Sequence, residues 1–231
     1  MTQTQLESIA AVLAGRHYLY SLFHQMFSQQ PQKELLDLLC SPFTAQALGL
    51  FAADDQDALA QGAEWLPGLP PRLADPDIAE AVENEYMHLF IGPGKLPAPP
   101  WESVYRGKQE FLFTDITLEV RDFYRSQGYL PQGYPHVADD SLGLELDFMA
   151  KLSQKALELF QAGNLQGALA QLRVQNIFLS SHLLAWVPQF VQRIQKVKVQ
   201  LLYPRLVEIN AAFLQQDQAL LAELIQTLAE N

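Results

Sequence analysis

The sequence predicts an all-α protein, a single-domain helical bundle of about ten helices joined by proline-rich loops. Apolar residues recur every three or four positions along most of the chain, and this spacing places them on one face of a helix. The interruptions fall mainly at prolines and glycines, which end helices. The chain has 231 residues, of which 49% are hydrophobic, and these suffice for one sizeable core. We therefore expect one domain spanning residues 1–231.

The first third of the chain predicts one long helix and several short ones. The long helix is expected over residues 5–28 and ends before Pro31. Short helices are expected over residues 33–39, 44–52 and 55–65. Residues 67–76 then hold four prolines. We interpret this segment as a turn-rich connector within the domain, because the helix that follows still needs partners for its apolar face.

That following helix is expected over residues 78–90. Asp77 precedes it and is the predicted N-terminal cap. Gly92 and Pro93 are expected to end it. The carboxylates of Glu80, Glu83 and Glu85 are expected to point away from its apolar face.

The loop over residues 96–101 is apolar, with three prolines that hold it extended and Trp101 at its end. A rigid loop loses little conformational entropy on binding, so it is a candidate recognition surface. The alternative is that Trp101 packs this loop onto the core, where most tryptophans lie.

The next two predicted helices cover residues 115–127, closed by Gly128, and residues 140–160. The second is expected to be the longest and to lie centrally, because it is apolar on more than one side. Asp139 and Asp140 begin it, and carboxylates at this position are stabilised by exposed amides and the helix dipole. Ser141 can also cap it.

The last part of the chain predicts a helix that begins over residues 165–172 and another over residues 177–194. Pro188 is expected to kink the latter, because it leaves the carbonyl of Leu184 without its helical donor. Two separate amphipathic helices are expected over residues 201–213 and 220–228.

Charge and composition narrow the class of partner. The net charge is −11, and residues 1–150 hold 21 of the 26 acidic residues, which disfavours nucleic acid and favours a basic partner. Cys40 is alone, so no internal disulfide or cysteine-based zinc site is expected. No apolar run is long enough to span a membrane, and the N-terminus lacks the pattern of an export signal. We expect a cytoplasmic protein without stable membrane insertion.

The string EYMHLFIGPGKLPAPPWESVY, residues 85–105, forms one long motif. This motif resembles the first signature of the TorD/DmsD/NarJ family of chaperones that bind twin-arginine leaders, and the TorD/DmsD branch above all. The matching residues are Glu85, Tyr86, Leu89, Phe90, Gly92, Pro93, Leu96, Pro97, Pro99, Pro100, Trp101, Glu102, Ser103, Val104 and Tyr105. The resemblance implies an all-helical cytoplasmic chaperone that assists the maturation of molybdenum-cofactor oxidoreductases.

The segment DDSLGLELDFMAKL, residues 139–152, is similar to the family's second signature, in which an acidic residue and a histidine begin a helix. Asp140 and Ser141 occupy those positions here, so the histidine is absent, and His136 lies five residues before Ser141. A serine hydroxyl can donate one hydrogen bond but carries no charge near neutral pH.

The resemblance implies a binding protein without cofactor or catalytic residues. Its ligand would be the twin-arginine leader, and also the body, of a molybdenum-cofactor oxidoreductase, whose export it delays. A leader of this kind has an arginine pair followed by an apolar stretch, so a protein that binds it needs acidic side chains beside an apolar groove. The leader-binding residues predicted on this basis are Tyr86, Leu89, Phe90, Pro100, Trp101, Glu102, Asp140 and Ser141. Each has an alternative role in the core or as a cap, and the protein is expected to be a monomer or a domain-swapped dimer.

Two other functions are open. The protein could recognise a non-exported molybdoenzyme subunit, as the NarJ branch does. It could also be a metal-dependent enzyme built on Glu85 and His88, an E-x-x-H pair of the di-iron type, although no second such pair exists in the sequence. His17 and His24 are seven residues apart, too far to chelate one ion unaided. We find no G-x-S-x-G, H-E-x-x-H or P-loop motif and predict a non-enzyme without a metal site.

Overall fold

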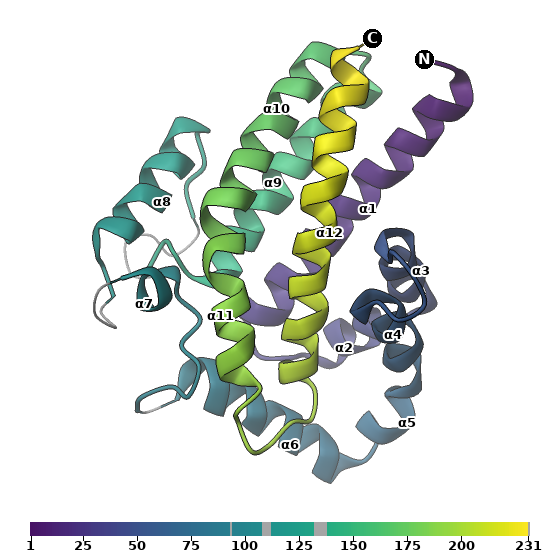
Figure 1. Cartoon of the computed structure of the whole chain (residues 1–231). Helices are drawn as coiled ribbons and strands as arrows, with labels where there is room; N and C mark the ends of the chain where they lie inside the picture. Colours follow the sequence, from purple (N-terminus) through teal and green to yellow (C-terminus); the bar gives the residue numbers. More distant parts are fainter. Residues whose placement is uncertain (93, 108–111, 132–137, 231) are drawn as a thin grey trace.

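The computed structural model describes residues 1–92, 94–107, 112–131 and 138–230. The all-α prediction is confirmed, because within these ranges the chain forms helices and turns and no named strand (Figure 1). A single antiparallel β-bridge there joins Trp101 to Ser141. Pro93, the expected helix end, and His136 lie outside the described residues. The domain span of 1–231 stays a prediction.

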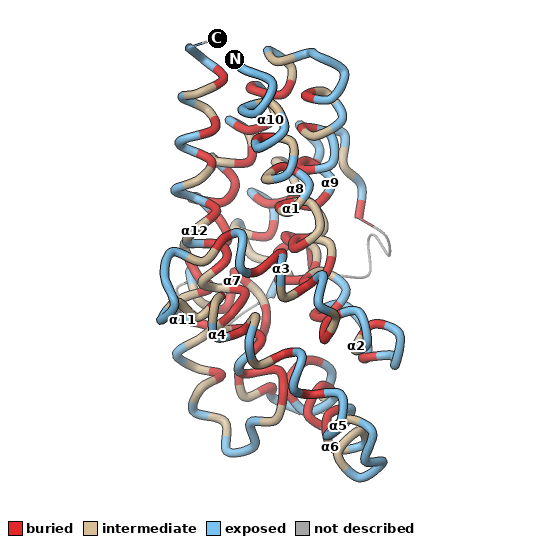
Figure 2. Tube along the Cα trace, turned by 90° about the vertical axis from the view of Figure 1, so that its right-hand side faces the viewer, coloured by how far each residue is buried: buried red, intermediate tan, exposed pale blue. Residues whose placement is uncertain are grey.

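Five helices form the upright bundle in Figure 1, with both termini at the same end. They are α1 (Gln3–Ser28), α9 (Leu142–Gln161), α10 (Leu165–Phe178), α11 (Leu184–Ile194) and α12 (Tyr203–Ala229). The principal contacts are α1 along α9, α9 along α10, and α10 along α12. Figure 2 shows the buried residues as stripes along these helices, the arrangement expected when apolar residues recur at helical spacing.

The prediction of two helices over residues 201–213 and 220–228 was wrong, because α12 is continuous from Tyr203 to Ala229. The residues between the two predicted segments contain no glycine or proline that would interrupt the helix. Asp217 lies in that stretch and is fully buried. It accepts hydrogen bonds from Arg16 of α1 and from the hydroxyl of Tyr20, so tertiary contacts hold the middle of α12 in place.

Short helices pack beside and below the lower half of the bundle in Figure 1. They are α2 (Lys33–Leu39), α3 (Pro42–Phe51), α4 (Ala58–Trp65), α5 (Pro70–Leu73) and α6 (Pro76–Tyr86). The proline-rich connector therefore contains a 3₁₀ turn and the helix α5. Asp75, not Asp77, caps α6, because its carboxylate accepts the backbone N–H of Asp77. The helix continues as a π-helical turn, Met87–Ile91, and ends at Gly92 with φ +29°.

Glu85 was predicted to point away from the apolar face of its helix, and this prediction did not anticipate its burial. Its side chain is buried and accepts backbone N–H groups from Leu201, Leu202 and Tyr203 at 2.7, 2.9 and 2.9 Å. The start of α12 has donors without helical partners, and the carboxylate satisfies them. Glu85 thus fixes the end of α6 against the start of α12.

The helices α7 (Glu102–Arg106) and α8 (Asp115–Ser126) lie beside the bundle (Figure 1). Gly128 follows α8 with φ +68°, as predicted for a helix end. The helix predicted to begin over 165–172 is α10, which continues to Phe178. The segment predicted over 177–194 covers the end of α10, a π-helical turn, Leu179–Leu183, and α11. Pro188 lies inside α11, and the kink expected there stays a prediction.

The predicted start of α9 was partly wrong. Ser141 is the N-terminal cap, and its hydroxyl accepts the backbone N–H of Leu144. Asp139 and Asp140 are buried before the helix and bind other elements instead. With 20 residues, α9 is also shorter than α1 and α12, which have 26 and 27.

Candidate functional site

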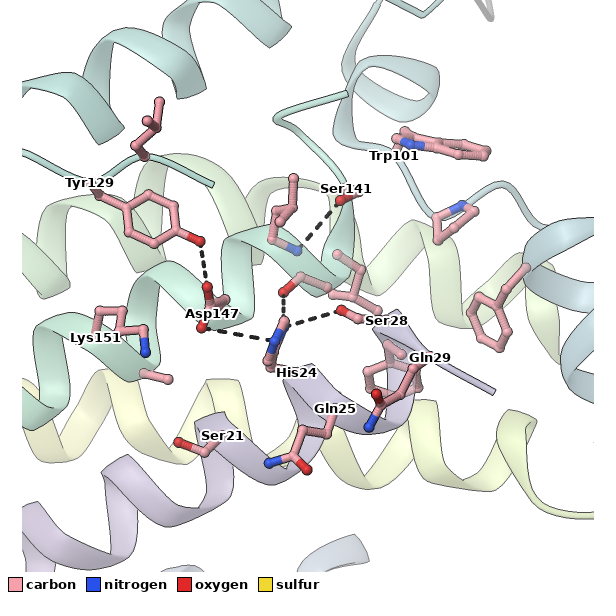
Figure 3. A pocket seen from close by; sticks show the side chains of 18 of the residues that line it. Ser21, His24, Gln25, Ser28, Gln29, Trp101, Tyr129, Ser141, Asp147 and Lys151 are labelled. Carbon is pink, nitrogen blue, oxygen red and sulfur yellow. Dashed lines mark hydrogen bonds and ion pairs between the residues drawn. The ribbon is translucent and has the colours of Figure 1, made fainter. Parts of the chain in front are cut away.

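A cavity of about 770 Å³ opens between α1, the π-helical turn after α6, the proline-rich loop and the start of α9 (Figure 3). We call it the main cavity. Its described lining residues are His17, Ser21, His24, Gln25, Phe27, Ser28, Gln29, Tyr86, Phe90, Ile91, Pro100, Trp101, Gly128, Tyr129, Leu130, Ser141, Leu142, Gly143, Leu144, Asp147, Ala150 and Lys151. Both family-like segments contribute to it.

Five of the eight predicted leader-binding residues line the main cavity. These are Tyr86, Phe90, Pro100, Trp101 and Ser141. Tyr86 and Phe90 are one turn apart, and their rings lie 5.3 Å apart. Trp101 is partly exposed, whereas Tyr86 and Phe90 are mostly buried. The cavity therefore has an apolar wall made by residues that also belong to the core.

Leu89, Glu102 and Asp140 are fully buried and do not line this cavity. Asp140 holds the loop against α8 and α9: its carboxylate accepts the backbone N–H of Ser103 at 2.8 Å and the hydroxyl of Thr117 at 3.0 Å. Its backbone carbonyl accepts the N–H of Glu102 at 2.9 Å. In this structure both Asp140 oxygens already have partners, so the acid positions the cavity wall.

Glu102 is held by the side chains of Arg106 and His182. Its carboxylate accepts hydrogen bonds from Arg106 and pairs with the Nδ1 atom of His182 at 3.0 Å. Glu145 of α9 lies in the same buried cluster and accepts the indole N–H of Trp186 at 3.0 Å. Burial, and next the negative charge of Glu102, raise the pKa of Glu145 well above its ordinary value. Glu145 therefore keeps its proton to a higher pH than an ordinary glutamate does.

The sequence interpretation missed the carboxylate that does reach the main cavity. Asp147 accepts the hydroxyl of Tyr129 at 2.5 Å, and its other oxygen lies 3.9 Å from Nε2 of His24 (Figure 3). Burial, and then the hydrogen bond to Asp147, raise the pKa of Tyr129 far above its ordinary value, so the phenol keeps its proton and donates it. Among the described lining residues, Asp147 is the one with a carboxylate.

His24 is fixed in place by the backbone of α9. Its Nδ1 atom lies 2.8 Å from the carbonyl oxygen of Gly143. Two turns earlier in α1, Nδ1 of His17 lies 3.1 Å from the carbonyl oxygen of Ala150. The seven-residue spacing of these histidines was the signal in the sequence, since it places both on the α1 face that meets α9. Lys151 lies one turn beyond Asp147, is exposed, and adds a positive charge at the rim.

The pair Glu85 and His88 does not form a metal site of the expected kind. Glu85 is occupied by backbone N–H groups, and His88 is exposed. Across the described ranges, no cluster of three or more His, Cys, Asp or Glu side chains is arranged to hold a metal ion. No helix in these ranges is long and apolar enough to cross a membrane.

Comparisons with known proteins agree with the resemblance of the two segments. The sequence profile of the nitrate reductase delta subunit family matches residues 49–192. The chaperone protein TorD of Vibrio cholerae (strain O395) is 30% identical over 74% of this chain and 77% of its own length. TorD of Psychrobacter sp. is 26% identical over 94% of this chain and 96% of its own. A protein of Haemophilus influenzae named "Probable Tat proofreading chaperone DmsD" is 28% identical over 63% of this chain. That match spans 64% of the Haemophilus protein, under two thirds of its length.

Proposed function

This chain belongs to the nitrate reductase delta subunit family, and we propose that it is a chaperone for the maturation of a redox enzyme, binding the enzyme's twin-arginine leader in the main cavity. The names of its relatives, TorD chaperones and Tat proofreading chaperones, support this class of function. The client in this proposal is a molybdenum-cofactor oxidoreductase held in the cytoplasm until its cofactor is inserted. The chaperone contributes binding and no chemical step.

The observation that carries the proposal is a carboxylate beside an apolar wall in one cavity. Such a leader has an arginine pair followed by an apolar stretch. Asp147 offers the oxygen near His24 as the acceptor of a charge-assisted hydrogen bond from a guanidinium, while its other oxygen accepts the hydroxyl of Tyr129. Tyr86, Phe90 and Trp101 provide apolar and aromatic surface within the same cavity. Asp147 thus replaces the buried Asp140 and Glu102 as the proposed contact of the arginines.

Rigidity supports the same use of the site. The backbone N–H of Leu142 donates to the carbonyl of Pro100 at 3.0 Å, and Arg193 donates to the carbonyl of Pro97 at 2.9 Å. These bonds fix the loop that carries Trp101 before any ligand arrives. A pre-ordered wall reduces the entropy lost on binding and suits reversible sequestration.

The test is calorimetric titration of the purified protein with synthetic twin-arginine leaders of redox enzymes, at low and high salt. A second copy of each leader has the arginine pair changed to alanine. We expect binding that weakens with salt and with loss of the arginines, because exposed charges are screened. Asp147→Asn should weaken binding of the arginine leader by roughly tenfold and the alanine copy little, since a charge-assisted pair contributes about 1.5–3 kcal/mol before screening.

The matched control is Asp122→Asn, which removes an acid that is 75% exposed on α8 and lies outside the cavity. Its affinity for the leader should equal that of the unaltered protein. Equal affinities for the arginine and alanine leaders would contradict the assignment of Asp147. Failure to bind any leader would refute leader binding itself.

A second candidate function is recognition of the enzyme body without its leader. The family's description as a nitrate reductase delta subunit favours it, since that description names an enzyme and not an export leader. A client protein from which the leader has been removed separates the two functions. Binding of this leaderless protein would support recognition of the enzyme body.

A further inference from the structure

A second cavity of about 510 Å³ adjoins the main cavity on the other side of Trp101. We call it the apolar cavity. The residues that give it its character are Ile91, Leu96, Pro99, Trp101, Val104 and Leu112. Ile91 and Trp101 line both cavities, so the two cavities adjoin at these side chains. An extended peptide that passes Trp101 therefore reaches both.

The two cavities differ in chemistry. The main cavity holds Asp147, two histidines and several hydroxyl and amide side chains. The described lining of the apolar cavity carries no carboxylate that could pair with arginine, and most of its side chains are apolar. Apolar walls favour aliphatic side chains.

Two large apolar side chains in the walls of the apolar cavity are exposed to solvent. Ile91 is 55% and Leu112 is 39% exposed, in a protein that buries most of its leucine and isoleucine side chains. Contiguous exposed apolar residues beside a polar site mark a binding surface. The prolines of the loop also keep this wall rigid, which favours capture of a flexible segment.

We propose that the apolar cavity receives the apolar stretch of the same leader whose arginines lie at Asp147, with Trp101 between the two parts. This inference rests on the proposed function and adds the register of the peptide. The arginines lie in the main cavity, the chain passes Trp101, and the following aliphatic side chains lie between Ile91, Val104 and Leu112. The division gives selectivity for leaders in which the arginines come directly before the apolar stretch.

The test pairs two substitutions with three peptides. Leu112→Asp places a charge in the apolar cavity. Leu118→Asp is the matched control, because Leu118 is 49% exposed on α8 and lines neither cavity. The peptides are a synthetic twin-arginine leader, a copy with the arginines changed to alanine, and a copy with the apolar stretch changed to serine. Calorimetry measures all the affinities, and a thermal melt confirms that both variants fold.

We expect Leu112→Asp to weaken binding of the leader by roughly tenfold, the loss for one well-buried aliphatic contact. The weakening should be the same for the copy without arginines. It should vanish for the copy without the apolar stretch, since that contact is already gone. Leu118→Asp should bind all three peptides as the unaltered protein does.

Equal leader affinities for Leu112→Asp and Leu118→Asp would overturn the inference and leave the proposed function standing. So would a Leu112→Asp effect that follows the arginines instead of the apolar stretch. If Leu112→Asp converted a dimer to a monomer in sedimentation and left leader binding unchanged, the apolar cavity would be a contact between two copies, and the inference would fail. If the unaltered protein bound no leader, the proposed function and this inference would fall together.

Discussion

Asp140 occupies the position of the family's acidic residue, which has two possible roles: contact with a leader or stabilisation of the fold. Removal of its carboxylate separates these two roles. The structure favours the second, because Asp140 is fully buried and accepts hydrogen bonds from the N–H of Ser103 and the hydroxyl of Thr117. Asp140→Ala deletes both acceptors and leaves two buried donors without partners. Asp140→Asn keeps one acceptor and nearly the same shape.

The magnitude follows from those two bonds. A hydrogen bond to a charged group contributes about 1.5–3 kcal/mol, and an orphaned buried donor costs a similar amount. Asp140→Ala should therefore lower the free energy of unfolding by roughly 3–5 kcal/mol, and Asp140→Asn by about 1–3 kcal/mol. For a domain of this size the alanine change corresponds to a fall in Tm of about 10 °C.

The assay combines thermal or urea unfolding with leader titration at two salt concentrations. If Asp140 only positions the loop, the affinity of Asp140→Asn for the leader should depend on salt as steeply as that of the unaltered protein, because the same charges meet the peptide. The slope should decrease for Asp147→Asn. The reasoning would be refuted by an Asp140→Ala variant that melts with the unaltered protein yet loses the salt-dependent part of leader binding.

Three further substitutions test buried acidic residues. Burial raises the pKa of Glu145, so its stabilising effect is complete below the ordinary value of about 4.3 and is lost as the pH rises toward the raised pKa. Glu145→Gln should remove this decline. In urea unfolding, the variant should therefore gain more stability over the unaltered protein at about pH 8 than at about pH 5. If the free energies of unfolding of the two proteins changed in parallel with pH, this reasoning would be contradicted. Glu85→Gln places an amide against the backbone N–H of Leu201 and should cost roughly 2–4 kcal/mol in urea unfolding. Asp217→Asn leaves Arg16 buried without its counter-charge and should cost about 3–5 kcal/mol in the same assay.

Exposed acids are the controls for these changes. Glu83→Gln, two residues from Glu85, and Asp122→Asn alter charge on the surface of α6 and α8. Each should change the free energy of unfolding by less than about 0.5 kcal/mol. A Glu85 or Asp217 variant as stable as its control would show that the buried contact does not stabilise the fold.

The sequence predicted most of the helices, because the signals that make them are local. The apolar spacing of α1 and the glycine after α8 act within a few residues, and both elements were found near their predicted places. The helix α5 within the predicted connector and the continuity of α12 were not predicted. Helix ends were less predictable. The cap of α6 is Asp75 and not Asp77, since two neighbouring acids compete for the same backbone donors.

The tertiary structure alone decided which acids are buried. Glu85 binds backbone 116 residues away, and Asp140 binds backbone 37 residues away, so nothing in their own helices indicates those partners. Asp147 reaches the main cavity because α1 and the chain after α8 both meet α9 beside it. A carboxylate is exposed or buried according to the donors that distant segments bring to it, and those distances exist only once the chain has folded.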